Sequence, residues 1–222
     1  MILRLSHRLD ERQPNWPGAP GLVRRPNHAI DQGDIANTHV VEIYSHYGTH
    51  CDVPYHFLPH GKTLSDFDVN DFVFDAPVVV DIPLDDNEVL HAQHLEPHAP
   101  RIAEADLLLI RSGFQEHRSD VDRYQSRGPG FSEQAAAFLR EVNPQLRGVA
   151  IDWLSLCALA HVEEGTQAHR TLLSERDDTC TLIFEDVDIA ALGERIPLRV
   201  LALPLFIDGL DGSPCTIIAE VT

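Results

Sequence analysis

HYGTHCDVPYHF, residues 46–57, is the stretch that decides the local fold and the chemistry expected of this chain. On a helix with ~3.6 residues per turn, His46 and His50 would share a face, whereas Asp52 and His56 would point away from it. On an extended strand all four residues have the same parity and lie on one face. The spacing therefore favours a strand over a helix for this segment.

The same segment must also bend. A fully extended run of this length would stretch to ~33 Å, which is too long to surround one ion. Gly48 and Pro54 are the residues that make bending easy. A strand that enters, kinks at Gly48 and leaves as a loop would bring His46, His50 and Asp52 together. Imidazoles and a carboxylate in this arrangement indicate a divalent metal with a nearby proton-transfer group, and hence metal-assisted hydrolysis.

Composition bounds the class of protein and its partners. The 222 residues are enough for one substantial core, so we expect a single domain over residues 1–222. Hydrophobic residues make up 43% of the chain and charged residues 23%, as in ordinary globular proteins. The formal net charge of -18 argues against nucleic acid or an anionic membrane as a partner, and it mildly disfavours strongly anionic substrates.

The remaining bulk features concern location and covalent chemistry. The amino terminus lacks an apolar stretch long enough for a signal peptide, and no ~18-residue apolar run follows, so we expect a cytoplasmic protein. The four cysteines are widely spaced and form no Cys-x-x-Cys pair, so neither a disulfide framework nor a cysteine zinc site is indicated. Cys51 has the opposite parity to the candidate ligands. We interpret it as a buried thiol beside the site, with a ligand role as the alternative.

Short apolar runs that end in turn residues predict strands along the whole chain. These runs cover residues 39–46, 76–82, 106–113, 147–152, 181–185, 198–204 and 215–221. The best helix is 129–143, where Ser132 can cap the first turn, and a mainly helical piece is expected around 165–174. The predicted class is mixed α/β, strand-rich with few helices.

At this point the residues resemble a known family. The run 46–57 resembles the signature of the cyclase-like metal hydrolases, which include bacterial kynurenine formamidase and isatin hydrolase. Weaker matches follow in the family's order over nearly the whole chain, at residues 16–18, 109–113, 148–152, 168–170, 183–185 and 211–214.

The resemblance implies a role for each matching position. His46, His50 and Asp52 correspond to the metal ligands, and His56 to the proton-transfer residue. His169 and Glu185 correspond to an outer pair that completes the catalytic site, and Trp16 to an aromatic wall of the substrate pocket. The family fold is a swivelling β/β/α domain that holds zinc or manganese and usually assembles as a homodimer or homotetramer.

Two departures from the formamidase pattern lie near the expected substrate. The segment between His169 and Glu185 is longer than in kynurenine-specific members, and its acidic part, residues 175–178, is predicted to be surface charge. Residues 153–155 read Trp-Leu-Ser where formamidases commonly have a small residue and a proline before the serine. We expect Trp153 to contact an aromatic or planar substrate, and His60 to line the pocket mouth.

The leading function is a metal-dependent hydrolase that cleaves a carbonyl–nitrogen bond of a small aromatic or cyclic amide with metal-activated water. A lactone hydrolase, or a cyclase or dehydratase, would use the same site, and a non-catalytic metal- or ligand-binding module is a third possibility. A serine or cysteine hydrolase is disfavoured because no Gly-x-Ser-x-Gly turn exists and Ser112-Gly113 alone is too weak a signal. The sequence leaves open whether the metal is zinc or manganese and whether one ion or two are bound. It also leaves open whether His56 is a ligand and whether His169 or Glu185 coordinates the metal directly.

Overall fold

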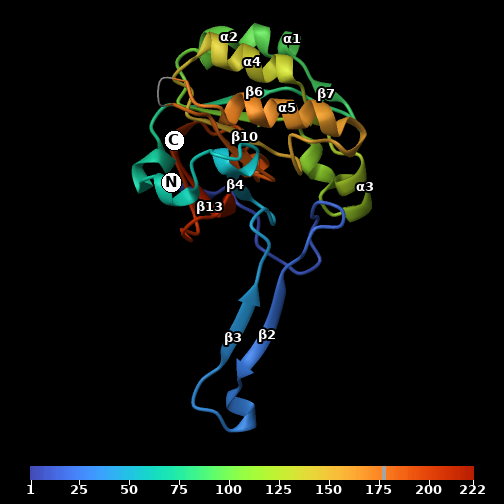
Figure 1. The fold of residues 1–222 in the computed structure, drawn as a ribbon, viewed down its shortest axis with the longest axis vertical. Helices are drawn as coiled ribbons and strands as arrows, with labels where there is room; N and C mark the ends of the chain where they lie inside the picture. The colour runs from blue at the N-terminus through green and yellow to red at the C-terminus, as the bar shows by residue number, and fades with distance from the viewer. Residues whose placement is uncertain (177–178) are drawn as a thin grey trace.

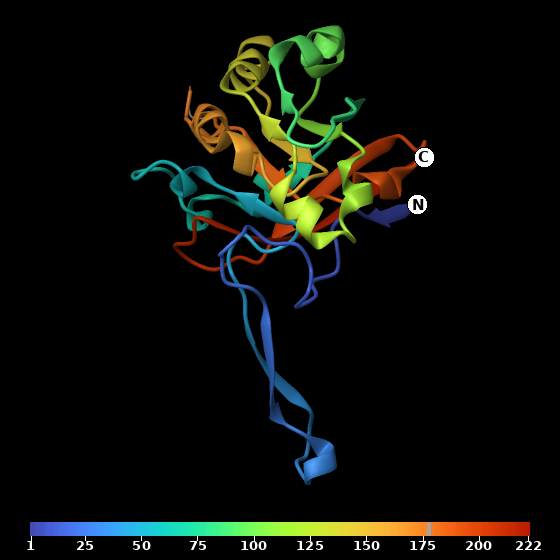
Figure 2. The same cartoon turned by 90° about the vertical axis from the view of Figure 1, so that its right-hand side faces the viewer.

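The computed structural model describes residues 1–176 and 179–222. Asp177 and Asp178, which belong to the acidic segment predicted to be surface charge, lie outside the described residues. The chain forms a body built on one large sheet, and a long two-stranded arm projects from that body (Figures 1 and 2). The two termini lie close together because the first strand pairs with the last.

The central sheet has the strand order β5-β12-β13-β4-β11-β10-β8-β6, and β1 pairs with β13 at one side. Strands β6, β8, β10 and β11 run parallel to one another, whereas β4 pairs antiparallel with both β11 and β13. The strands of this sheet are β1 (Ile2–Arg4), β4 (His50–Asp52), β5 (Val73–Phe74), β6 (Pro77–Asp81), β8 (Leu107–Arg111), β10 (Gly148–Ile151), β11 (Leu182–Glu185), β12 (Pro197–Pro204) and β13 (Gly212–Val221).

Of the parallel strands, β8, β10 and β11 are buried on both faces, which explains their continuous apolar runs, whereas β6 at the end of the strand order is only partly buried. Along β8, Leu108 and Ile110 belong to the core under the helices, whereas Leu107 and Leu109 belong to the core shared with β12 and β13. Successive side chains on a strand point to opposite faces. An unbroken Leu-Leu-Leu-Ile run therefore supplies both cores from one strand.

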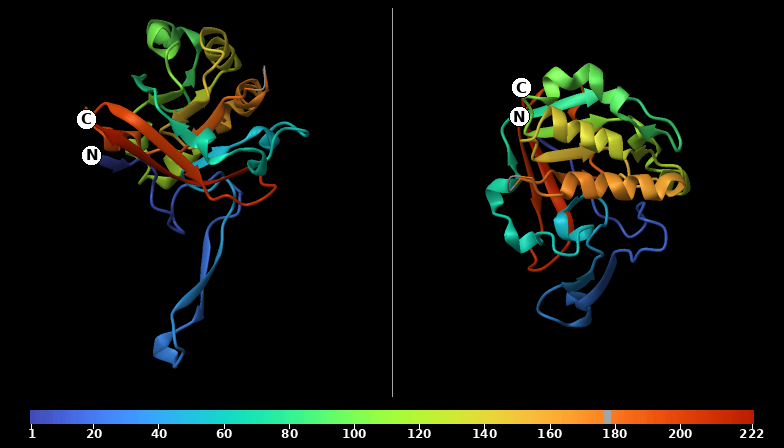
Figure 3. Two further views of the ribbon diagram at one scale, coloured as in Figure 1. Left: turned by 90° about the vertical axis from the view of Figure 1, so that its left-hand side faces the viewer. Right: turned by 45° about the horizontal axis from the view of Figure 1, so that its top comes forward.

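Helices cover the first of these two cores (Figure 3). They are α1 (Ala92–Leu95), α2 (Ala99–Ile102), α3 (Val121–Ser126), α4 (Glu133–Val142) and α5 (Val162–Leu173). The predicted cap of α4 is confirmed, because the Ser132 side chain accepts a hydrogen bond from the backbone N–H of Ala135 at 3.1 Å. Among the described residues, no helix is long and apolar enough to cross a membrane.

Two small sheets and several 3-10 turns complete the chain. Strands β7 (Val89–Leu90) and β9 (Gly130–Phe131) form one sheet, and β2 (Val23–His28) and β3 (Thr38–Glu42) form the arm. The 3-10 helices are η1 (Ile30–Gln32), η2 (Pro54–His56), η3 (Leu64–Asp66), η4 (Val69–Phe72), η5 (Glu96–His98), η6 (Phe114–His117), η7 (Leu159–His161) and η8 (Ile189–Leu192).

The predicted α/β, strand-rich class is confirmed, and so are six of the seven predicted strands. The prediction of a strand over residues 39–46 is wrong at its carboxyl end. The strand ends at Glu42, and its residues Val40 and Val41 are exposed because they lie on the arm rather than in the body. The kink at Gly48 is present, with φ +66°, but the segment beyond it continues as strand β4 rather than as a loop.

Candidate metal centre and active-site pocket

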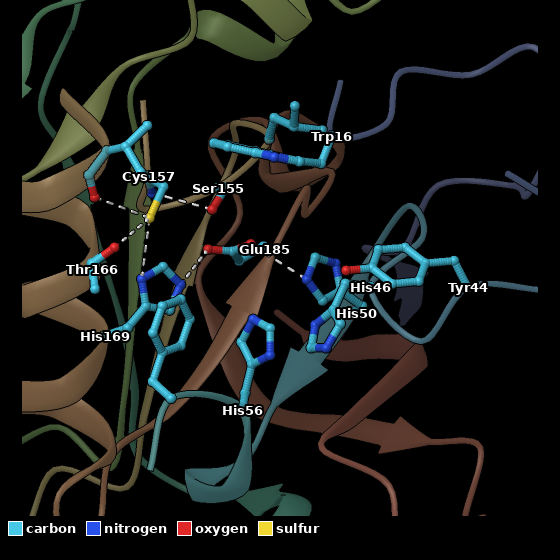
Figure 4. Close-up of a pocket in the computed structure, with 13 residues that line it drawn as sticks. Trp16, Tyr44, His46, His50, His56, Ser155, Cys157, Thr166, His169 and Glu185 are labelled. Atoms are coloured by element: carbon cyan, nitrogen blue, oxygen red, sulfur yellow. Dashed lines mark hydrogen bonds and ion pairs between the residues drawn. The ribbon is translucent and has the colours of Figure 1, made fainter. Parts of the chain in front are cut away.

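A pocket of about 270 Å³ opens where β4 and β11 meet α5 (Figure 4). His169 and Thr166 come from α5 on one side, and Trp16 and Tyr44 come from the amino-terminal part of the chain on the other. The pocket is lined by Trp16, Tyr44, His46, His50, His56, Phe57, Leu154, Ser155, Cys157, Val162, Thr166, His169 and Glu185.

Strand β4 presents two of the candidate ligands on one face. His50 and Asp52 are two residues apart and point the same way, and Glu185 on β11 is the register partner of His50. Cys51 points to the opposite face, where it is fully buried in the second core. Burial raises the pKa of its thiol well above the usual value. The structure therefore places Cys51 away from the ligand cluster, in agreement with the parity argument.

The bend at Gly48 brings the side chain of His46 next to Asp52 on β4. A side chain at Gly48 would meet the side-chain nitrogen of Gln13 at 2.4 Å and Leu9 at 2.8 Å, and its positive φ also favours glycine. Because the chain turns here, His46 Nδ1 lies 2.7 Å from Asp52 Oδ1 although it is not on the strand.

His50, Asp52 and Glu185 form the first candidate cation site. One donor atom from each lies within 4.8 Å of the others. His50 Nε2 is 3.3 Å from an oxygen of Asp52 and 3.3 Å from an oxygen of Glu185. His169 closes the group, with its Nε2 3.2 Å from Glu185 and 3.4 Å from Asp52. All four side chains are buried.

The hydrogen bonds made by Nδ1 of His50 and of His169 show that the site requires a positive charge. His50 Nδ1 lies 2.7 Å from the Gly48 carbonyl, and His169 Nδ1 lies 2.7 Å from the carbonyl of Gly165. A carbonyl only accepts, so both Nδ1 atoms donate, and in the neutral rings both Nε2 atoms carry lone pairs. Those lone pairs would face carboxylate oxygens. Only a positive charge, either a proton on each ring or a metal ion, makes this arrangement favourable.

The protonation equilibria agree with this view. Burial alone would lower the pKa of His50 and His169, but hydrogen bonds with Asp52 and Glu185 raise the pKa of both well above the usual value. Burial and the charge of Asp52 would raise the pKa of Glu185, yet hydrogen bonds with His169 and His50 lower it to about 2. The carboxylates are thus held ionised in a buried site that attracts cations.

A second candidate site shares Asp52 with the first. It consists of His46, Asp52 and His56, again with donor atoms within 4.8 Å. The rings of His46 and His56 stack with centroids 3.8 Å apart. Both rings also approach the same oxygen of Asp211, with His46 Nε2 at 2.8 Å and His56 Nδ1 at 3.1 Å.

Asp211 is the main residue that sequence reasoning missed. It lies within the 211–214 match, but the sequence alone assigns it no role, because a carboxylate in a turn before Gly-Ser-Pro carries no signal of its own. Despite partial burial, hydrogen bonds with His46 and His56 hold the pKa of Asp211 far below its usual value. The residue therefore acts as an anionic anchor for both rings.

The structure brings together His46, His50, Asp52, His56, His169 and Glu185, and it places Trp16 in the pocket wall. Two substrate-contact expectations need correction. Trp153 is fully buried in the helix-covered core, and Leu154 and Ser155 form the wall instead. His60 lies in an exposed turn and is not among the lining residues, because the chain leaves the pocket after Phe57.

The donor set fits a divalent cation. Asp52 Oδ2 is buried and accepts no well-aligned hydrogen bond from any described residue, as expected of an oxygen reserved for an ion. Imidazole nitrogens mixed with carboxylate oxygens suit zinc or manganese. His50, Asp52 and Glu185 would hold the ion, with His169 beside them, and His46, Asp52 and His56 form the alternative donor group.

A family model with the description "Putative cyclase" matches residues 3–156, which is more than half of the chain. The chain belongs to this cyclase family. The match includes the whole 46–57 stretch, so the residues that carry the earlier resemblance are inside the matched region.

Curated relatives and solved structures agree with this assignment. Cyclase-like protein 1 of Arabidopsis thaliana is 27% identical over 96% of this chain and 82% of its own length. Kynurenine formamidase of Bacillus cereus is 27% identical over 95% of this chain and 92% of its own. Isatin hydrolase A from Labrenzia aggregata, solved with benzyl benzoate, superimposes with a TM-score of 0.81 at 23% identity, covering 100% of this chain and 94% of that one. The last comparison establishes the shared fold.

Proposed function

We propose that this protein is a metal-dependent hydrolase that cleaves the carbonyl–nitrogen bond of a small, uncharged aromatic or cyclic amide. The observation that carries the proposal is the pair of imidazoles, His50 and His169, whose Nδ1 atoms donate to carbonyls while their Nε2 atoms face buried carboxylates. The names of the formamidase relative and of the isatin hydrolase neighbour support the choice of an amide substrate.

The cation supplies one part of the chemistry. When bound, a divalent ion lowers the pKa of water from ~15.7 toward ~7 and polarises a carbonyl oxygen. One imidazole and two carboxylates, from His50, Asp52 and Glu185, would hold this ion, and catalytic sites of this kind use three protein ligands beside water or substrate.

His56 supplies the proton-transfer step. Its side chain is 23% exposed and lines the pocket, so it can reach a substrate atom. Because Asp211 accepts from Nδ1, Nε2 keeps its lone pair and points away from the anchor. That nitrogen can take a proton from attacking water and then give it to the leaving nitrogen, and Asp211 holds the ring in place during both transfers.

The rest of the pocket fits a substrate without charge. Its walls away from the cation site come from Trp16, Tyr44, Phe57, Leu154 and Val162, and neither lysine nor arginine occurs among the described lining residues. A carboxylate on the substrate would therefore be buried without a basic partner, which is costly. Trp16 and Phe57 offer flat faces for a planar ring.

The test joins metal analysis to a substrate panel. Purified protein is measured for bound transition ions and then assayed on N-formyl aromatic amines, isatin-like lactams, small cyclic imides and lactones. We expect bound zinc or manganese, turnover of at least one uncharged amide, loss of activity on chelation and recovery when the ion is restored.

His50→Ala provides the matching variant, and it should lose both ion content and turnover. Full activity in ion-free protein, or in His50→Ala, would overturn the proposed function. Hydrolysis confined to lactones would move the protein to the rival reaction at the same site.

A further inference from the structure

The hydroxyl of Tyr44 is a polar group of the active-site pocket that the proposed reaction leaves without a role. Tyr44 lies between the end of β3 at Glu42 and the candidate ligand His46, on the segment that leads from the arm into the pocket. Its side chain is half-buried, and its ring centroid lies 5.5 Å from that of His46. Figure 4 shows the hydroxyl directed into the pocket, toward the imidazoles of His46 and His50.

The other three tyrosines of the chain use their hydroxyls elsewhere. Tyr47 donates a hydrogen bond of 2.7 Å to a backbone carbonyl, and Tyr124 donates one of 2.9 Å to the buried carboxylate of Asp186. Tyr55 faces solvent with 45% of its surface exposed. No group within the part of the chain that the structure describes accepts a hydrogen bond from Tyr44. Tyr44 therefore holds an unused hydrogen-bond donor inside a pocket.

The other side-chain hydroxyls of the pocket lie across from Tyr44 and have close neighbours of their own. Ser155 Oγ accepts the backbone N–H of Cys157 at 3.1 Å, and Thr166 Oγ1 lies 4.0 Å from Cys157 Sγ. These three side chains lie together on the side of α5 (Figure 4). A substrate held between the two walls would meet the hydroxyl of Tyr44 from the side of His46.

Tyr44 and His56 both contact the ring of His46. The His56 ring stacks on it with centroids 3.8 Å apart, and the Tyr44 ring is tilted by 58° to it. All three side chains line the same pocket. The hydroxyl of Tyr44 and the outer nitrogen of His56 can therefore reach two different atoms of one small substrate.

Hydrolysis of an amide requires a donor at a defined place. Attack on the carbonyl carbon moves negative charge onto the carbonyl oxygen, and a preorganised donor aimed at that oxygen stabilises the transition state. A phenol keeps its proton at neutral pH and can donate it in a hydrogen bond. The described lining residues include neither lysine nor arginine, and the carboxylate of Glu185 can only accept. The hydroxyl of Tyr44 is thus suited to this oxygen.

We propose, building on the proposed function, that Tyr44 is a catalytic residue whose hydroxyl donates a hydrogen bond to the oxygen of the carbonyl group under attack. The hydrogen bond strengthens as the oxygen of water bonds to the carbonyl carbon and the carbonyl oxygen becomes an oxyanion. It weakens again when the carbonyl re-forms, the carbon–nitrogen bond breaks and the leaving nitrogen takes its proton from His56. The Tyr44 proton stays on Tyr44 throughout, so the products are the same acid and amine.

The first test removes the hydroxyl and keeps the ring. In Tyr44→Phe the ring can still pack against His46, so bound ion measured by mass spectrometry and circular dichroism should be unchanged. We expect kcat for an uncharged aromatic amide to fall by ~10²–10³-fold, the usual effect of losing one oxyanion donor. KM should change little, because the hydrogen bond gains most of its strength in the transition state.

The matched control makes the same chemical change at an exposed tyrosine. Tyr55→Phe removes a hydroxyl that faces solvent, and it should leave kcat, KM and ion content as in wild type. If Tyr44 serves only as an apolar wall, Tyr44→Phe would keep its kcat, and this result would overturn the proposal. A rise in KM at constant kcat would also overturn it, because the hydroxyl would then bind substrate and transition state equally.

A binding measurement tests the same hydrogen bond without turnover. An aryl trifluoromethyl ketone forms a hydrate with a tetrahedral carbon, whereas the matching aryl methyl ketone stays planar. Isothermal titration calorimetry on ion-loaded protein should show that Tyr44→Phe binds the trifluoromethyl ketone about tenfold or more weakly than wild type does. The methyl ketone should bind both proteins equally. An equal loss for the two ketones, or no loss for either, would contradict the assigned role.

The outcomes separate this proposal from the proposed function. If wild type hydrolyses an amide and Tyr44→Phe is equally active, Tyr44 has no catalytic role and the proposed function stands. If wild type neither hydrolyses any amide of the panel nor binds the trifluoromethyl ketone, the proposed function fails, and the role of Tyr44 fails with it.

Discussion

Replacing Glu185 with glutamine in the metal-free protein gives the sharpest test of the electrostatics of the site. Glu185 is buried between His50 and His169 and also accepts the backbone N–H of Leu156 at 2.6 Å. Its pKa is lowered from 4.5 to about 2. At 1.36 kcal/mol per pKa unit, this corresponds to about 3 kcal/mol of stability, within the range for breaking a buried ion pair.

Because folding lowers the pKa of Glu185, the stability that this residue contributes depends on pH. A carboxyl whose pKa is lower in the folded state than in the unfolded state contributes stability that is fully present above the unfolded value of about 4.5. That contribution is lost as pH falls toward about 2. Glu185→Gln should therefore be about 3 kcal/mol less stable than wild type near pH 6, and the difference should shrink as the pH approaches 2.

Urea denaturation with a chelator present, followed by circular dichroism between about pH 2.5 and 6, measures this difference. Glutamine has the same shape and can still accept from Leu156, so packing is preserved. Glu194 is exposed, and Glu194→Gln serves as the control with an unchanged curve. If the stability of Glu185→Gln follows wild type in parallel over the whole range, the carboxylate is not paired as the structure indicates.

Three further predictions concern the imidazoles and the pocket wall. The pKa values of His50 and His169 are raised in the folded state, so in the metal-free protein their contribution to stability is fully present below about pH 6.5. That contribution should be lost as the pH rises through the pKa values of the folded state. Thermal melts with and without chelator should show this loss only in the chelated sample. His56→Gln should keep its bound ion by mass spectrometry and lose ~10²–10⁴-fold in kcat, whereas loss of the ion would make His56 a ligand. Trp16→Ala should raise KM for an aromatic amide by about tenfold or more with ion content unchanged, and an unaltered KM in steady-state kinetics would remove Trp16 from the substrate wall.

The part of the site that sequence could predict is the part set by short-range geometry. His50 and Asp52 share a face because side chains alternate along a strand, and Cys51 faces the core for the same reason. Glycine at position 48 predicted the bend because a tight left-handed turn favours that residue. These inferences need only a few residues of chain.

The rest depends on contacts between distant segments. His46 and Asp211 are 165 residues apart, and only the pairing of β13 with β4 brings them together. Trp153 follows a strand that ends near the pocket, yet its side chain turns into the helix-covered core, and the sequence holds no signal for that choice. Residues 39–46 alternate with β-branched residues, which predicts a strand of the body, but local pattern does not distinguish a strand that packs on a core from one that lies exposed on an arm.

Asp211 and Gly212 together position the His46 ring against the central sheet. Gly212 is the register partner of Asp52 on β13, in the interior of the mixed sheet. A side chain at this glycine would lie 2.6 Å from the ring of His46 and 2.6 Å from the Cys51 carbonyl, so only glycine lets the ring pack down on the strand. The carboxylate of Asp211 then lies 2.8 Å from Nε2 of the His46 ring, and the carboxylate of Asp52 lies 2.7 Å from its Nδ1. His46 is thus held between two anions, and a single glycine without a side chain is what allows a histidine outside the strand to join a site built on it.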